Sequence, residues 1–101
     1  MLNKEMRSAC DAICDHITAH GPVHAYELQE HFHISGPDLR AVINRLRTEG
    51  FLICSGARGY WYAENEEEAE AVIADLEHRQ AGLAAACAGL SEGVRNTFHA
   101  V

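Results

Sequence analysis

The chain has 101 residues, of which 48% are apolar, and a formal net charge of −7. This composition suits one domain with a single packed core and excludes a disordered chain. No apolar run approaches the roughly 18 residues that cross a bilayer, and the N-terminal segment MLNKEMRSAC has no signal-peptide core, so we expect a soluble, cytoplasmic protein without a membrane segment.

The first half of the sequence predicts three helices. The first spans residues 3–20 and stops before Pro22, and a short second helix covers residues 25–32. Ser35 is expected to cap the third helix, which ends at Gly50. Apolar residues at helical spacing form the buried stripes of the first and third helices, namely Met6, Cys10, Ile13, Cys14 and Ile17, then Leu39, Val42, Ile43 and Leu46.

Two strands and a long helix are predicted next. Aromatic and β-branched residues indicate strands over residues 51–55 and 59–63, joined by a glycine-flanked turn that carries Arg58. Asn65 is expected to cap a final helix that has glutamates in its first turn and continues to about Leu90. The predicted fold class is therefore mostly α with a small β-hairpin (α+β).

Charge is unevenly distributed along the chain. Between residues 36 and 58, four arginines stand against two acidic residues and leave +2. Between residues 64 and 101, eight acidic residues stand against two arginines and leave −6. Such asymmetry bears on the partners of a protein rather than on its fold.

The segment PVHAYELQEHFHISGPDLRAVINRLRTEGFLICSGARGYWYA resembles a winged helix-turn-helix domain, most specifically in the pieces RLRTEG and GARGYWYA. The resemblance covers about residues 3–63, and its style is similar to that of small phage and prophage proteins. It implies a domain over residues 1–63 followed by a helical, dimerising extension over residues 64–101. It also implies that the third helix enters the major groove of double-stranded DNA while the hairpin, or wing, contacts backbone or minor groove.

The side of the third helix opposite its apolar stripe is narrow. At 100° per residue it consists of Pro37, Ala41, Asn44 and Thr48, flanked by Arg40 and Arg45. Asn44 and Arg40 are the leading candidates for reading bases, because Asn can hold adenine and Arg can hold guanine through two hydrogen bonds each. The predicted DNA-binding residues are Ser35, Gly36, Arg40, Ala41, Asn44, Arg45, Arg47 and Arg58.

The remaining members of this set would contact the DNA backbone. Ser35 and the amide of Gly36 are candidates for phosphate binding at the start of the helix. Arg58 would neutralise a phosphate or enter a narrow minor groove. His24 and Arg47 would add further backbone contacts.

Other interpretations of these residues stay open. The arginines of the third helix can form an ordinary solvated face, with Glu49 paired to Arg45 four residues before it. The aromatic run at residues 60–62 can stack on single-stranded bases, although closing the core and covering the root of the wing is the favoured role.

No metal, cofactor or catalytic site is expected. Cys10 and Cys14 lie on the buried stripe, away from the direction of His16, and zinc needs a convergent set of about four ligands. There is no nucleophile–base pair and no phosphate loop, so the predicted protein is not an enzyme. The cysteines, interpreted as buried hydrophobic residues, are Cys10, Cys14, Cys54 and Cys87.

The final helix is too long to be buried along its whole length on one small domain. We expect it to form a homodimer that places two recognition helices at half-sites about one DNA turn apart, although residues 78–80 interrupt a clean heptad. A hairpin folded over the first helix is the alternative. The predicted dimer interface consists of Leu76, Leu83, Cys87 and Leu90.

A second hypothesis for function is an acidic protein-interaction module. It is favoured by the net charge of −7. In this case the glutamate-rich segment Glu64–Glu70 would dock a basic protein partner, as a phage-borne inhibitor or adaptor would.

Overall fold

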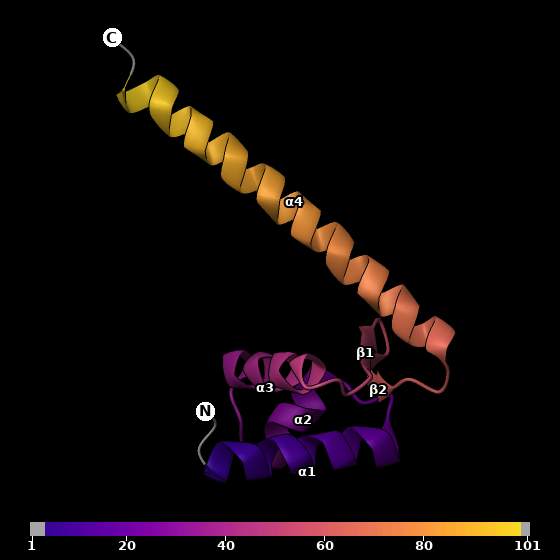
Figure 1. The fold of residues 1–101 in the computed structure, drawn as a ribbon. Helices are drawn as coiled ribbons and strands as arrows, with labels where there is room; N and C mark the ends of the chain where they lie inside the picture. The colour runs from indigo at the N-terminus through magenta and orange to yellow at the C-terminus, as the bar shows by residue number, and fades with distance from the viewer. Residues whose placement is uncertain (1–3, 100–101) are drawn as a thin grey trace. The chain divides into compact units, whose positions relative to one another are not determined.

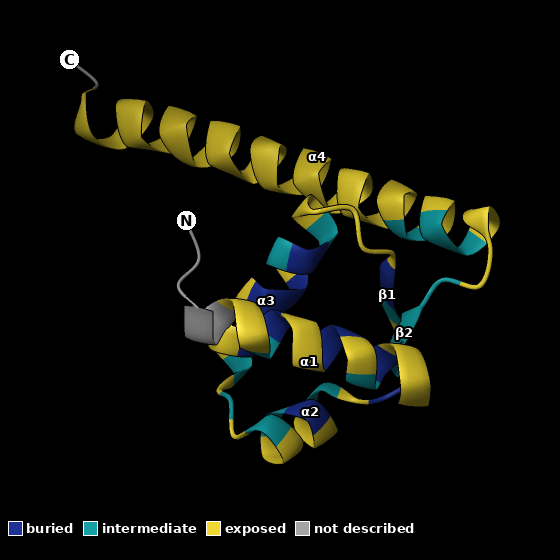
Figure 2. Cartoon of the chain, turned by 60° about the horizontal axis from the view of Figure 1, so that its bottom comes forward, coloured by how far each residue is buried: buried dark blue, intermediate teal, exposed yellow. Residues whose placement is uncertain are grey.

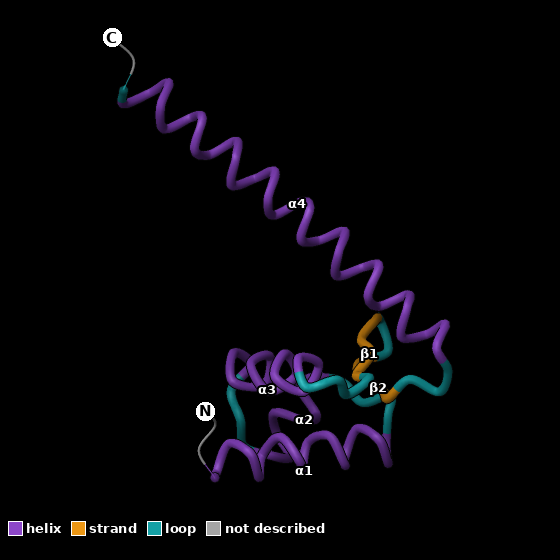
Figure 3. Tube along the Cα trace, viewed as in Figure 1, coloured by secondary structure: helices purple, strands orange, loops and turns teal. Residues whose placement is uncertain are grey.

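The computed structural model describes residues 4–99 and the side chains of residues 7–99. Its elements in chain order are α1 (Lys4–His20), α2 (Ala25–Phe32), α3 (Gly36–Thr48), β1 (Ile53–Gly56), β2 (Gly59–Tyr62) and α4 (Glu66–Phe98) (Figures 1 and 3). The expected class, mostly α with a small hairpin and a long last helix, is confirmed. The predicted helix start at Asn3 and the side chain of Met6 lie outside the described parts.

The chain divides into two compact units, one up to Ala69 and one from Glu70 on. The first turn of α4 belongs to the first unit, where the Cys54 thiol lies 3.8 Å from the carbonyl oxygen of Glu68. Asn65 caps this helix as predicted, because its Oδ1 accepts the amide N–H of Glu68 at 2.9 Å. In return, the Glu68 carboxylate accepts the amide N–H of Glu64 at 2.8 Å.

The core of the first unit lies where α1, α2 and α3 meet the hairpin, as the dark blue residues of Figure 2 show. Helix α3 packs on α1, on α2 and on β1. Three elements therefore fix the direction of its outer face. The predicted stripes are buried, together with residues of the second helix and the strands: Cys10, Ile13, Cys14, Ile17, Val23, Leu28, Leu39, Val42, Ile43, Leu46 and Ile53.

Strands β1 and β2 pair antiparallel, with Gly56 opposite Gly59. Val23 joins them as an isolated edge, as expected for residues 22–24, and exchanges two backbone hydrogen bonds of 2.8 Å with Tyr60. This close approach requires a glycine at position 59. The φ angle there is +105°, and a Cβ would lie 2.3 Å from the carbonyl oxygen of Val23.

Two element boundaries differ from the prediction. Strand β1 begins at Ile53 rather than Phe51, because the amide of Phe51 still bonds the carbonyl oxygen of Leu46 at 3.0 Å and closes the end of α3. Helix α4 continues past Leu90 to Phe98. Its second half is rich in alanine and has no proline, which favours helix despite three glycines.

From residue 70 to residue 98, the residues of α4 are exposed except for Val72, which is half-buried (Figure 2). The prediction that all cysteines are buried was therefore wrong for Cys87. A free helix has no interior of its own, so an apolar side chain on it is covered only by another element or another chain. Between residues 4 and 99, no helix is long and apolar enough to cross a membrane.

Candidate nucleic-acid interface

The outer face of α3 is exposed along its length and slim in its middle. Pro37, Arg40, Ala41, Asn44 and Thr48 all lie on the solvent side. The hydroxyl of Thr48 donates to the carbonyl oxygen of Asn44 at 2.8 Å, so the amide side chain of Asn44 takes no part in that bond. With small groups in the middle, the helix can come close to a flat or grooved surface.

A tight turn between α2 and α3 sets the start of this face. His33 adopts the left-handed conformation, with φ 52°, and its N–H bonds the carbonyl oxygen of Gln29. Ser35 then caps α3 as predicted, because its hydroxyl accepts the amide N–H of Asp38 at 3.2 Å. The first amides of a helix have no intrahelical acceptor and lie at the positive end of its dipole. The start of α3 therefore has the electrostatics of an anion site.

Arg40 and Arg45 flank the outer face in different ways. The Nη1 atom of Arg40 lies 3.5 Å from the place that a Cβ on Gly36 would take, so the missing side chain leaves room for the guanidinium. Arg45 donates from Nε to the carboxylate of Glu49 at 3.0 Å, the pairing that the sequence left open. The side chains of this pair are 42% and 33% exposed, so its contribution is small, about 0.3–0.5 kcal/mol.

Arg47 points away from the outer face and toward the hairpin. Its Nε donates to the carbonyl oxygen of Ile53 at 2.8 Å, and its Nη2 donates to the hydroxyl of Ser55 at 2.9 Å. The side chain therefore ties the end of α3 to β1. At the tip of the same hairpin, Arg58 occupies the turn between Gly56 and Gly59 and is exposed.

The order and arrangement of these elements can be compared with known families. A family model described as a winged helix-turn-helix domain matches residues 8–59, which is more than half of the chain. The chain belongs to this winged helix-turn-helix family. No curated protein matches the chain.

In the winged helix-turn-helix domain, α2 and α3 form the helix pair and the β1–β2 hairpin forms the wing. Such a domain indicates DNA binding or regulation, and the family is typically non-enzymatic. Of the residues predicted to bind DNA, one group lies together at the start and outer face of α3, namely Ser35, Gly36, Arg40, Ala41 and Asn44. Arg58 lies separately on the wing tip, while Arg45 and Arg47 are engaged in the contacts described above.

The aromatic run of the wing divides its side chains between two environments. Tyr60 and Tyr62 pack against the core. The ring of Trp61 lies over the hairpin, 3.3 Å from the place of a Cβ on Gly56. Two of the three rings are thus used in the fold, which weakens the case for stacking on single-stranded bases.

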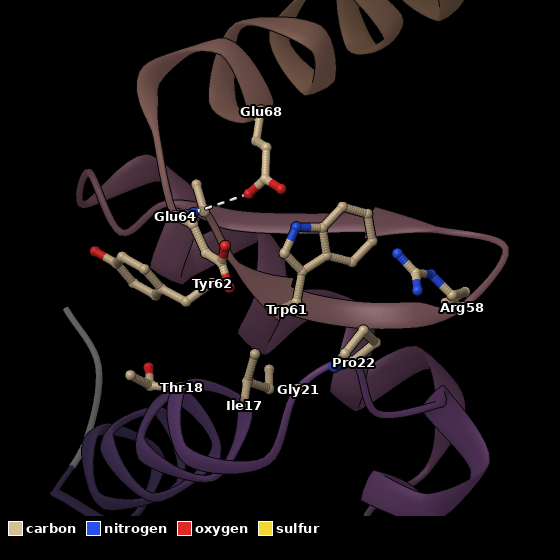
Figure 4. A pocket seen from close by; sticks show the side chains of 10 residues that line it. Ile17, Thr18, Gly21, Pro22, Arg58, Trp61, Tyr62, Glu64 and Glu68 are labelled. Carbon is tan, nitrogen blue, oxygen red and sulfur yellow. Dashed lines mark hydrogen bonds between the residues drawn. The ribbon is translucent and has the colours of Figure 1, made fainter.

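A cavity of about 540 Å³ lies between the end of α1 and the wing (Figure 4). Trp61 stands in its middle, with Arg58 toward one end and the carboxyl groups of Glu64 and Glu68 toward the other. The cavity therefore combines an aromatic surface with acidic groups. Its lining consists of Ile17, Thr18, Gly21, Pro22, Arg58, Trp61, Tyr62, Ala63, Glu64 and Glu68.

Three histidines meet on the surface of α1 and α2, a cluster that the sequence pattern did not predict. The ring centroid of His16 lies 4.6 Å from that of His20 and 4.6 Å from that of His31. Burial lowers the pKa of His16, and the charges of His20 and His31 lower it further. The i,i+4 spacing of His16 and His20 was a visible signal, but the packing of α2 supplies the third ring.

The cysteines and histidines supply no metal site. Burial raises the pKa of the Cys10, Cys14 and Cys54 thiols, which favours the inert protonated form. Within the described part of the chain, no group of three or more histidine, cysteine, aspartate or glutamate side chains is arranged to hold a metal ion.

Proposed function

We propose that this protein binds double-stranded DNA in a sequence-specific manner, as a transcription regulator or a phage replication accessory protein in the cytoplasm of a bacterial cell. The observation that carries the proposal is the outer face of α3. It is exposed, it has Ala41 in its middle, and it places Arg40 and Asn44 opposite a buried stripe. A major groove about 12 Å wide admits one helix with such a face.

Base recognition is assigned to Asn44 and Arg40. Asn44 can pair with N6 and N7 of an adenine, and Arg40 can pair with O6 and N7 of a guanine. Arg45 is the next candidate, because its exposed pairing with Glu49 is weak enough to exchange for a DNA contact.

Backbone contacts are assigned to both ends of the domain. The first amides of α3, at Ser35 and Gly36, suit a phosphate. Arg58 on the wing tip suits a second phosphate or a minor groove. The hydrogen bonds of Arg47 to β1 support a different role from the predicted one, in which it orients the wing and contributes to DNA binding through Arg58.

Selection of binding sites from random duplexes at moderate salt tests the proposal. Wild-type protein is expected to yield one consensus, and the double variant Arg40→Ala/Asn44→Ala is expected to lose it. The matched control is His78→Ala on α4, which should retain the consensus. A consensus that survives the double variant would move the reading surface elsewhere on the protein.

The salt dependence of duplex affinity separates the contribution of the wing. Each phosphate contact that a cation makes adds about 0.9 to the slope of log K against log salt. Arg58→Ala should therefore reduce the slope by about 1 and weaken all duplexes alike. A change in the consensus would assign Arg58 to base reading instead.

A second candidate function is binding of a basic protein at Glu64–Glu70. The cavity beside the wing favours it, because Trp61, Glu64 and Glu68 together suit a cationic side chain. Retention of a stoichiometric basic partner that is lost in Glu64→Gln/Glu67→Gln, with no retention of DNA, would decide for this function.

A further inference from the structure

Helix α4 carries an apolar stripe that keeps one phase from Ala69 to Val94. Residues along it alternate at spacings of three and four, as the a and d positions of a heptad do. Of the residues 78–80, which were expected to interrupt the heptad, only Gln80 lies on the stripe. The d positions are Ala69, Leu76, Leu83 and Leu90, and the a positions are Ile73, Gln80, Cys87 and Val94.

The length of this stripe limits what can cover it. From Ala69 to Val94 the helix rises about 38 Å at 1.5 Å per residue, whereas a compact unit of the size of residues 1–69 has a radius of gyration of about 11 Å. Leu83 and Leu90 are 69% and 73% exposed. A second copy of the chain has both the required length and the same pattern.

We propose that α4 pairs with α4 of a second copy in the antiparallel orientation. The charges of the helix carry this assignment. Residues 66–77 contain six acidic residues and no basic one, whereas residues 79–98 contain two arginines and one glutamate. A parallel pair sets the acidic halves side by side, and an antiparallel pair sets each beside a nearly neutral half. Antiparallel helix dipoles also attract each other.

Residues beside the stripe are complementary in size in the same orientation. Antiparallel coils bring e positions against e positions and g against g. The long side chains at these positions, Glu77 and Arg79, then face the small Ala84 and Ala86 of the partner subunit. In a parallel pair the small residues of the second half meet one another and leave the stripe poorly covered.

One register pairs every a and d residue between Ala69 and Val94. It places Ile73 against Leu90, Leu76 against Cys87, and Gln80 against Leu83 of the partner subunit. The two-fold axis then passes between Gln80 and Leu83. The two Gln80 side chains lie in neighbouring layers, where their amides can bond each other and satisfy the one polar position of the stripe.

This pairing supplies the dimer that two DNA half-sites require, yet it does not depend on DNA binding. It is tested on the full chain without DNA. Failure of the test leaves the DNA-binding surface of α3 untouched, and loss of DNA binding leaves the pairing intact.

Mild oxidation tests the orientation through Cys87, the exposed cysteine of the four. In the proposed register the two Cys87 residues are 11 residues apart along the axis, about 16 Å, far beyond the roughly 7 Å that a disulfide spans between Cα atoms. Wild type should therefore stay uncrosslinked, while Leu76→Cys should convert most chains to a covalent dimer through a 76–87 link. Leu83→Cys, opposite Gln80, is the matched control and should give no link.

Sedimentation of the same samples completes the test. Wild type and Leu83→Cys are expected as non-covalent dimers. A monomeric wild type, or a Cys87–Cys87 link, would overturn the proposal, and so would a dimeric Leu76→Cys that fails to crosslink. If Leu76→Cys is monomeric, Ile73→Cys/Leu90→Cys in a Cys87→Ser background decides, because only the antiparallel register joins 73 to 90.

Discussion

The Nε atom of Arg47, in the last turn of α3, donates a hydrogen bond of 2.8 Å to the carbonyl oxygen of Ile53, at the start of β1. A second bond from Nη2 to the Ser55 hydroxyl, at 2.9 Å, makes the contact two-pronged. The recognition helix and the wing are thus joined by one side chain. Changes at Arg47 should affect both folding and the position of Arg58.

Arg47→Ala is expected to lower the free energy of unfolding by about 1–2 kcal/mol, because partly buried hydrogen bonds from a charged donor are lost. Arg45→Ala, which removes only an exposed pair, should cost no more than about 0.5 kcal/mol. Urea denaturation followed by circular dichroism and by the fluorescence of the single tryptophan measures both. Equal losses in the two variants would contradict the structural role of Arg47.

Ser35 has two assigned roles that one pair of variants separates. Asp caps a helix as well as Ser does, so Ser35→Asp should unfold within about 0.5 kcal/mol of wild type, whereas Ser35→Ala should lose about 1 kcal/mol. The added charge of Ser35→Asp should repel phosphate and weaken duplex binding by about ten-fold or more at low salt. Fluorescence anisotropy with a labelled duplex gives the affinities. Wild-type affinity in Ser35→Asp would remove the start of α3 from the interface.

Gly59 and Gly50 both have positive φ angles, +105° and +96°, but differ in their surroundings. Gly50→Ala meets no atom within 4 Å, so only the backbone conformation opposes it, at about 1 kcal/mol. Gly59→Ala adds a clash with the backbone of Val23 and should cost about 3 kcal/mol or more. Thermal denaturation of both variants checks the difference. Similar losses would mean that the edge at Val23 contributes little.

The histidine cluster predicts a pH dependence of stability. The pKa of His16 is lowered from its usual 6.5 by burial and by His20 and His31, with Glu27 acting in the opposite direction. The unfolded chain therefore takes up this proton at a higher pH than the folded chain does. The stability contributed by neutral His16 is present above about pH 6.5 and is lost as pH falls through the lowered value.

His16→Gln should accordingly flatten the fall in the free energy of unfolding below pH 6.5. Urea denaturation at a series of pH values measures this slope. The control for the loss of one histidine is His78→Gln, on α4 outside the cluster. An equal change of slope in both variants would show that the cluster has no special role.

The amino-acid sequence determined the elements and the buried face of each, because helix periods, caps and turn glycines act between residues that are close along the chain. The stripe from Leu39 to Leu46, the cap at Ser35 and the turn at Arg58 all follow from such local rules. Alanine-rich sequence also favours helix locally, and the end of α4 at Phe98 was missed only because stripe regularity was given more weight than propensity.

Tertiary structure alone decided which partners the polar side chains take. Arg47 and Arg45 look alike in the sequence, yet one bonds the strand that follows and the other pairs on its own helix. His31 joins His16 and His20 because α2 packs beside the end of α1. Such contacts depend on the distance and direction between elements, which only the packing of the whole core sets.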